Sequence, residues 1–214
     1  MDLCGGSTAP GSERHPARGL GGWSRRALVR RGAAGGAAVL IGGILARPTS
    51  GADAAPSKRQ DAKIFNFALL LEYLQAAFYS DGVSRGGLRG EVRSFAETVS
   101  EHEREHVAYL QKALGANARS KPTFDFGDAT KNEKSFVATA VLLENLGVAA
   151  YNGQAANLTK PALAAAAEIV SVEGRHAAWI SDLAGLPPAP RAADPGASAT
   201  EVVAALNRTG FLKQ

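Results

Sequence analysis

Two short segments of the chain carry glutamate and histidine at a spacing that suits the binding of metal ions. Glu103 and His106 lie three residues apart in His102-Glu103-Arg104-Glu105-His106, and Glu173 and His176 repeat that spacing in Glu173-Gly174-Arg175-His176. Residues i and i+3 lie on one face of a helix, so both side chains of each pair can reach the same ions. Carboxylates and imidazoles together are ligands of iron and manganese.

The first segment also matches His-Glu-x-x-His, the zinc-protease signature, in which His102 and His106 would bind Zn²⁺ and Glu103 would act as general base. Such a site normally needs a third ligand further along the chain. His102 falls beside the apolar face of its helix rather than on it, and a protease does not explain why the pair recurs at Glu173. A zinc metalloprotease stays a remote alternative, and we expect His102 at the rim, outside the metal ligands.

An internal repeat supplies two further glutamates. Residues 69–79 and 141–151 are identical at six of eleven positions, and the identities include Glu72 with Glu144 and Tyr79 with Tyr151. In each copy a helix with a lone glutamate precedes a helix with a Glu-x-x-His pair. The repeat therefore predicts two related helical hairpins.

The hydrophobic pattern predicts an all-α fold, because four segments have helical periodicity and none alternates strictly as a strand does. The helices are expected at 57–80, 91–114, 131–157 and from Thr159-Lys160-Pro161 to Leu183-Ala184-Gly185. Glycines predict a loop over 81–90 and a helix end at Gly115. Residues 116–130 are long enough to cross a whole bundle. We therefore expect a four-helix bundle of two hairpins with a long crossover, plus a short C-terminal helix near 200–206 that packs against it.

All four glutamates fall on the apolar faces of these helices. Glu103 and His106, for example, lie between Val99 and Leu110 at steps of three and four residues. Unpaired carboxylates in a bundle core would be very costly, so they must either take up protons through a raised pKa or bind cations. Two divalent ions would neutralise four carboxylates. The predicted metal ligands are Glu72, Glu103, His106, Glu144, Glu173 and His176.

The N-terminal region differs from the rest in charge and composition. Residues 1–60 carry nine Lys and Arg against three Asp and Glu, whereas residues 61–214 carry fifteen against seventeen, which argues against a nucleic-acid-binding face on the domain. Residues 24–30, Ser-Arg-Arg-Ala-Leu-Val-Arg, are similar to a twin-arginine signal. An uncharged apolar stretch at 32–46 and a small-x-small site at 52–54 follow.

These features predict three parts of the chain. Residues 1–54 would be a disordered extension and a twin-arginine-type signal peptide, residues 55–186 the bundle, and residues 187–214 a Pro-rich segment with the short helix. The apolar stretch is shorter than the roughly 20 residues of a membrane span, so no stable span is expected after cleavage. The protein is predicted to be exported, to the periplasm or another extracytoplasmic space.

Taken together, the motifs resemble those of exported bacterial ferritin-like domain proteins, which are similar to fungal and plant desiccation- or sexual-development-associated proteins. The resemblance covers residues 61–185 and rests on the motifs at 71–74, 77–79, 102–107, 143–151 and 172–179. It implies that Glu103 and Glu173 bridge two iron or manganese ions, that His106 and His176 each bind one ion, and that Glu72 and Glu144 are terminal ligands. Zinc fits this pattern less well.

The resemblance also indicates the surroundings of the site and its chemistry. Gln75 stands where many relatives have a second acid, and Tyr79 and Tyr151 are candidates for hydrogen bonds to the ligands, as is His102. The implied activity is that of a ferroxidase or a manganese-catalase-like oxidoreductase, with O₂ or peroxide as the partner and a link to oxidative or desiccation stress. A homo-oligomer is compatible with the family. A non-enzymatic, stress-protective helical bundle is the main alternative.

Overall fold

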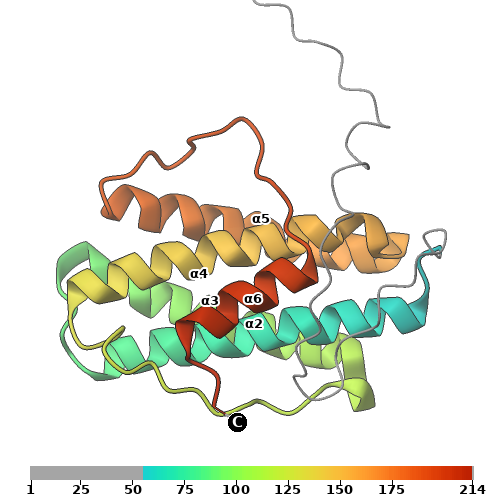
Figure 1. The fold of residues 1–214 in the computed structure, drawn as a ribbon, viewed down its shortest axis with the longest axis horizontal. Coiled ribbons are helices and arrows are strands. Elements are labelled where there is room, and N and C mark those ends of the chain that lie inside the picture. The colour runs from blue at the N-terminus through green and yellow to red at the C-terminus, as the bar shows by residue number, and fades with distance from the viewer. Residues whose placement is uncertain (1–54, 214) are drawn as a thin grey trace, which may run out of the picture. The chain divides into compact units, whose positions relative to one another are not determined.

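A computed structural model describes residues 55–213, which form five α-helices (Figure 1). Their bounds are α2 Lys58–Ser84, α3 Gly90–Leu114, α4 Glu133–Gln154, α5 Lys160–Leu183 and α6 Ala199–Thr209. Short 3₁₀ turns, Gly115–Asn117 and Ala155–Asn157, follow α3 and α4. The described residues contain no strand, only an isolated bridge between Phe124 and Leu212. The predicted all-α fold is confirmed.

Helices α2 and α3 pack together as one hairpin, and α4 and α5 as the other. Two apolar clusters fill the bundle. One contains Phe78, Phe95, Phe136 and Ile180, and the other contains Phe65, Leu69, Leu110, Tyr151 and Ile169. On α3 and α5 a glutamate lies between the residues of the first cluster and those of the second. These two glutamates therefore lie between two apolar layers.

The same two clusters fix the directions of the helices. On α3 the first cluster takes its residues from the beginning and the second from the end. On α4 most residues of the first cluster lie in the first half, and the second cluster takes Tyr151 from the last turn, so α3 and α4 run the same way. The connection between them must travel the length of the bundle, as Figure 1 shows. The C-terminal segment pairs with this crossover, since Asp125 N–H donates to Phe211 O (2.9 Å) and Lys213 N–H to Thr123 O (3.0 Å).

Local signals set the ends of the helices. Ser57 caps α2 by accepting from Gln60 N–H, and Asn132 caps α4 by accepting from Ser135 N–H at 3.0 Å. Helix α6 begins with a capping box between Ser198 and Glu201. Its Val202 and Leu206 are buried in the first cluster, so α6 packs on the bundle against α4, as expected.

The predicted loop over 81–90 is wrong in its first part, because α2 continues through Asp81-Gly82-Val83 to Ser84. Gly82 is there for packing and not to end the helix. A Cβ at this position would overlap the ring of Phe136, so only glycine lets that ring lie against α2. Other bounds shift slightly: α4 begins at Glu133, after its Asn132 cap, and ends at Gln154, before a 3₁₀ turn, and α6 extends to Thr209. Gly115 ends α3 with a φ of 54°, as predicted.

The predicted extension and signal peptide at 1–54 lie outside the described residues. Within 55–213, no helix combines the length and the apolar character that crossing a membrane requires.

Candidate metal centre

The structure brings the six predicted metal ligands together in the core. The four glutamates are at most 1% exposed, although each comes from a different helix; they are Glu72, Glu103, Glu144 and Glu173. His106 is 8% exposed and His176 is 3% exposed. Carboxylates buried to this degree require either protons or cations as partners.

The six side chains form two groups, each compact enough to hold an ion. We name the groups after their lone glutamates. The Glu72 position consists of Glu72, Glu103, His106 and Glu173, and the Glu144 position consists of Glu103, Glu144, Glu173 and His176. In each group one atom from every residue lies within 4.8 Å of the others. Glu103 and Glu173 belong to both groups.

Distances show which atoms face each position. His106 Nδ1 lies 3.3 Å from Glu72 Oε2, 3.5 Å from Glu103 Oε2 and 3.2 Å from Glu173 Oε1. His176 Nδ1 lies 3.2 Å from Glu103 Oε1, 3.4 Å from Glu144 Oε2 and 3.8 Å from Glu173 Oε1. Glu103 thus directs one oxygen to each position, whereas Glu173 directs the same oxygen to both.

Seven buried polar atoms in the described part of the chain have no hydrogen-bond partner, and all seven belong to these six residues. They are Glu72 Oε2, both oxygens of Glu103, His106 Nδ1, Glu144 Oε2, Glu173 Oε1 and His176 Nδ1. Buried polar atoms are almost always hydrogen-bonded, so an exception calls for an explanation. These are the same atoms that converge on the two positions, and metal coordination would satisfy them all.

The remaining oxygens of the lone glutamates are held by tyrosines from the opposite hairpin. Tyr79 O–H donates to Glu144 Oε1 at 2.5 Å, and Tyr151 O–H donates to Glu72 Oε1 at 2.6 Å. Burial, followed by the charge of the neighbouring glutamate, raises the pKa of both tyrosines well above the usual value. Both tyrosines therefore keep their protons and leave each glutamate one free oxygen.

Gln75 and Gly147 both lie next to Oε2 of Glu173, the oxygen that faces neither metal position. The Gln75 amide donates to Glu144 Oε1 at 3.2 Å and to Glu173 Oε2 at 3.5 Å. A Cβ added to Gly147 would lie only 2.7 Å from Glu173 Oε2. The absence of a side chain at Gly147 thus lets this buried carboxylate lie against α4 without shifting. The internal repeat aligns Gln75 with Gly147, so the two hairpins differ here.

His102 lies outside both groups, next to His176. Its Nδ1 is 2.9 Å from His176 Nε2, and the planes of the two rings are nearly parallel, 16° apart, with centroids 5.1 Å apart. If His176 Nδ1 presents its lone pair to an ion, then His176 Nε2 carries the proton and donates to His102. Burial, with the nearby charges of His176 and His106, lowers the pKa of His102, which favours the neutral acceptor. The arrangement does not resemble a zinc protease, where His102 would face the same ion as His106.

The cluster is electrostatically strained without a cation. Burial and then repulsion from neighbouring carboxylates raise the pKa of Glu103 and Glu173 well above the usual value. Burial alone would lower the pKa of His106, but its contacts with Glu103, Glu173 and Glu72 raise it to about 12. Burial would likewise raise the pKa of Glu72, but His106 lowers it. The metal-free cluster therefore holds protons that an ion would displace.

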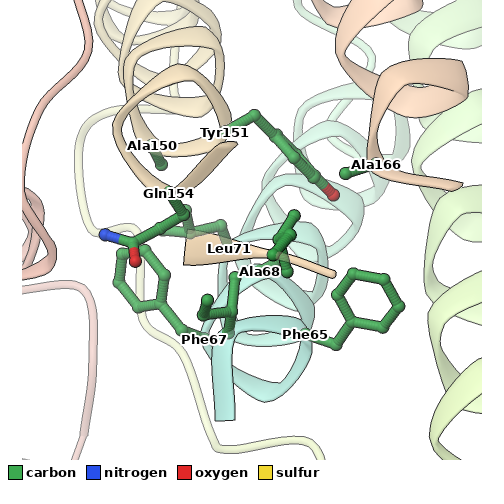
Figure 2. Close-up of a pocket in the computed structure, with 10 residues that line it drawn as sticks. Phe65, Phe67, Ala68, Leu71, Ala150, Tyr151, Gln154 and Ala166 are labelled. Atoms are coloured by element: carbon green, nitrogen blue, oxygen red, sulfur yellow. The ribbon is translucent and has the colours of Figure 1, made fainter. Parts of the chain in front are cut away.

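Two spaces adjoin the site. A groove between α3 and α5 is lined by His102, His106, Val172, Arg175, His176 and Trp179, so it reaches both imidazoles from the surface. A small apolar cavity of about 10 Å³ lies on the other side, among residues of α2, α4 and α5. Figure 2 shows Tyr151 extending across it from α4 toward Ala166. Such a volume holds one water molecule at most.

A helical bundle whose core joins four carboxylates and two imidazoles is the architecture of a metal-binding bundle. Comparison with known families agrees, because the family model described as ferritin-like domain matches residues 60–186. The chain belongs to the ferritin-like domain family. No curated protein matches it.

The sequence indicated the main residues of the site but not the role of Gly147. The structure brings all six predicted ligands together and puts Tyr79, Tyr151, Gln75 and His102 in contact with them. The spacing could not reveal that Gly147 makes room for Glu173. A glycine inside an apolar helix, opposite Gln75 in the repeat, was the available signal.

Proposed function

We propose that the protein binds two divalent ions, iron or manganese, at the Glu72 and Glu144 positions and uses them in redox chemistry with O₂ or peroxide. The observation that carries this proposal is the set of seven unpartnered buried atoms, which divide between two overlapping positions. Glu103 and Glu173, which belong to both groups, would hold both ions. Glu72, Glu144 and the two histidines would each bind a single ion.

Bound iron or manganese would pass electrons to O₂ or peroxide, taken from ferrous iron in ferrous oxidation or from a second peroxide molecule in disproportionation. The residues of the chain do the rest. Tyr79 and Tyr151 fix the terminal carboxylates, and Gln75 fixes Glu144 and Glu173. The apolar clusters on both sides keep bulk water from the carboxylates, while the α3–α5 groove gives a small molecule a route to the histidines.

The composition of the site does not favour iron over manganese, since both accept carboxylate and imidazole ligands. The candidate activities are therefore ferrous oxidation and peroxide disproportionation. We also propose export through the twin-arginine-type signal at 24–54, which would place the activity outside the cytoplasm. The activity would serve there in the response to oxidative or desiccation stress. Homo-oligomerisation is compatible with this role.

Metal analysis of the purified protein, together with peroxide and ferrous-oxidation assays, tests the proposal. Wild type should contain close to two ions per chain and turn over in a metal-dependent way. Glu103→Ala should lose both properties, and Glu101→Ala, an exposed change on the same helix, should lose neither. A wild-type protein that binds no Fe, Mn or Zn and melts identically with and without chelator would instead indicate a purely structural bundle.

A further inference from the structure

The two metal positions are built from repeated residues, yet their surroundings are not equivalent. Three contacts that hold ligands in place fall on the Glu144 position. The Glu72 position lacks counterparts to two of them, and the third counterpart is more loosely packed. This difference comes from a few residues at which the two hairpins diverge.

The first contact is made by His102. Its Nδ1 lies 2.9 Å from Nε2 of His176 in a ring–ring hydrogen bond, in which His102 is the acceptor when His176 Nδ1 presents its lone pair to an ion, and this bond fixes the orientation of the His176 ring. The residue at the equivalent place in the repeat is Val172, which precedes Glu173 as His102 precedes Glu103. Valine offers no acceptor. In the described chain Nε2 of His106 accordingly has no hydrogen bond, and its side chain is 10% exposed against 3% for His176.

The second contact is made by Gln75. Its amide donates to Glu144 Oε1 at 3.2 Å, and Glu72 has no counterpart to this bond; the longer bond, to Glu173, concerns a residue that both positions share. The equivalent residue is Gly147, which has no side chain to offer. Glu144 thus has two donors on its outer oxygen, Tyr79 and Gln75, while Glu72 has only Tyr151.

The third difference concerns the two tyrosines. Tyr79 is fully buried among aromatic rings, with centroids of Phe78, Phe95 and Phe136 at 5.3, 5.8 and 5.7 Å. Tyr151 is 7% exposed and borders the apolar cavity of Figure 2. The tyrosine that holds Glu144 is therefore packed on more sides than the one that holds Glu72.

We propose that the protein holds one resident ion at the Glu144 position and one weaker, exchangeable ion at the Glu72 position. This inference rests on the proposed dinuclear site. Ligands that are already fixed lose less conformational freedom when an ion binds, and groups that orient metal ligands are typically worth about 10–100-fold in affinity. Two identical, independent sites already give two stepwise dissociation constants that differ by a statistical ratio. We expect the measured constants to differ by about a further 10–100-fold.

A calorimetric titration of the full-length protein with Mn²⁺, after chelator has removed bound metal, tests the inference. The wild type should bind two ions in separate steps. The matched variants His176→Ala and His106→Ala then locate the tighter ion: the tight step should be lost in the first variant and kept in the second. Far-UV circular dichroism establishes that both variants fold.

Two milder variants separate this cause from simple repulsion between the two cations. His102→Ala should weaken the tight step by about 10–100-fold and leave the weak step unchanged. Val172→His, which offers His106 the partner that His176 already has, should strengthen the weak step alone. Repulsion would instead leave the difference between the steps intact in both variants.

The outcomes separate the proposed dinuclear site from the unequal affinity of its two positions. A wild type that binds no Mn²⁺ would contradict the proposed dinuclear site itself. Two equal steps in wild type, or a tight step that is lost in His106→Ala and kept in His176→Ala, would overturn the inference and leave the dinuclear site standing.

Discussion

Replacing Glu103 with glutamine should stabilise the metal-free protein and abolish its stabilisation by metal. Both carboxylate oxygens of Glu103 are buried without a hydrogen bond, and the side chain is 0% exposed. Glutamine has the same shape but no charge, and its amide can donate to the neighbouring carboxylates. His106 is not left unpaired by the change, because Glu72 and Glu173 still lie within 3.3 Å of it.

The expected size of the effect follows from these contacts. A buried polar atom without a partner costs about 1–3 kcal/mol. Glu103 has two such atoms, but the glutamine amide can satisfy only part of what they lack. We therefore expect Glu103→Gln to raise the free energy of unfolding by about 1–3 kcal/mol in total. For a domain of this size each kcal/mol raises Tm by roughly 2–4 °C. With Mn²⁺ at 100 times its Kd, wild type should gain about 2.7 kcal/mol per ion, whereas the variant should gain little.

Thermal unfolding followed by circular dichroism, with EDTA and with Mn²⁺, measures both effects. The order of stability should therefore reverse: the variant melts above wild type in EDTA and below it in Mn²⁺. Glu101→Gln, an exposed change on the same helix, should follow wild type in both conditions. A Glu103→Gln protein that melts below wild type in EDTA and is still stabilised by Mn²⁺ would refute the reasoning.

Three further predictions concern protons, packing and hydrogen bonds at the site. Metal affinity should rise with pH. The pKa of His106 is about 12, so in the metal-free protein His106 keeps its proton throughout the neutral range, and a binding ion must displace it. Calorimetry in two buffers of different ionisation enthalpy counts the protons released. Gly147→Ala should lower the free energy of unfolding by about 1–3 kcal/mol and weaken Mn²⁺ binding, because its Cβ would lie 2.7 Å from Glu173 Oε2. The control Gly174→Ala, whose Cβ would contact nothing within 4 Å, should leave the protein equally stable or stabilise it. Chemical denaturation measures both variants. Tyr79→Phe should leave the Glu144 oxygen without its closest donor and weaken the tight Mn²⁺ step more than Tyr151→Phe weakens it, and equal effects would contradict the assigned positions.

The helices and the buried cluster of glutamates and histidines were predictable because each depends on local periodicity. A glutamate that recurs among apolar residues at steps of three and four must point into the core, and four such helices leave few ways to arrange their acids. The repeat made the pairing of Glu72 with Glu144 visible. The repeat also predicted the two helical hairpins, and the length of residues 116–130 predicted the long crossover.

The errors and omissions concern glycines and contacts between distant segments. Gly82 was taken as a breaker, but it accommodates Phe136, which lies more than fifty residues away. The role of Gly147 depends in the same way on Glu173 from another helix. Periodicity reports which face of a helix is buried, not which atom it meets. For the same reason the sequence could place His102 outside the ligand set without identifying His176 as its partner.

The crossed tyrosines have a consequence for how the site can be assembled. Tyr79 donates to a glutamate 65 residues later and Tyr151 to one 79 residues earlier, so each hairpin completes the other's ligand and not its own. A fragment that contains one hairpin would carry half of the ligands with their donors missing. Separated halves should therefore be unable to retain metal, and mixing them should restore it, which makes metal retention a direct reporter of hairpin docking.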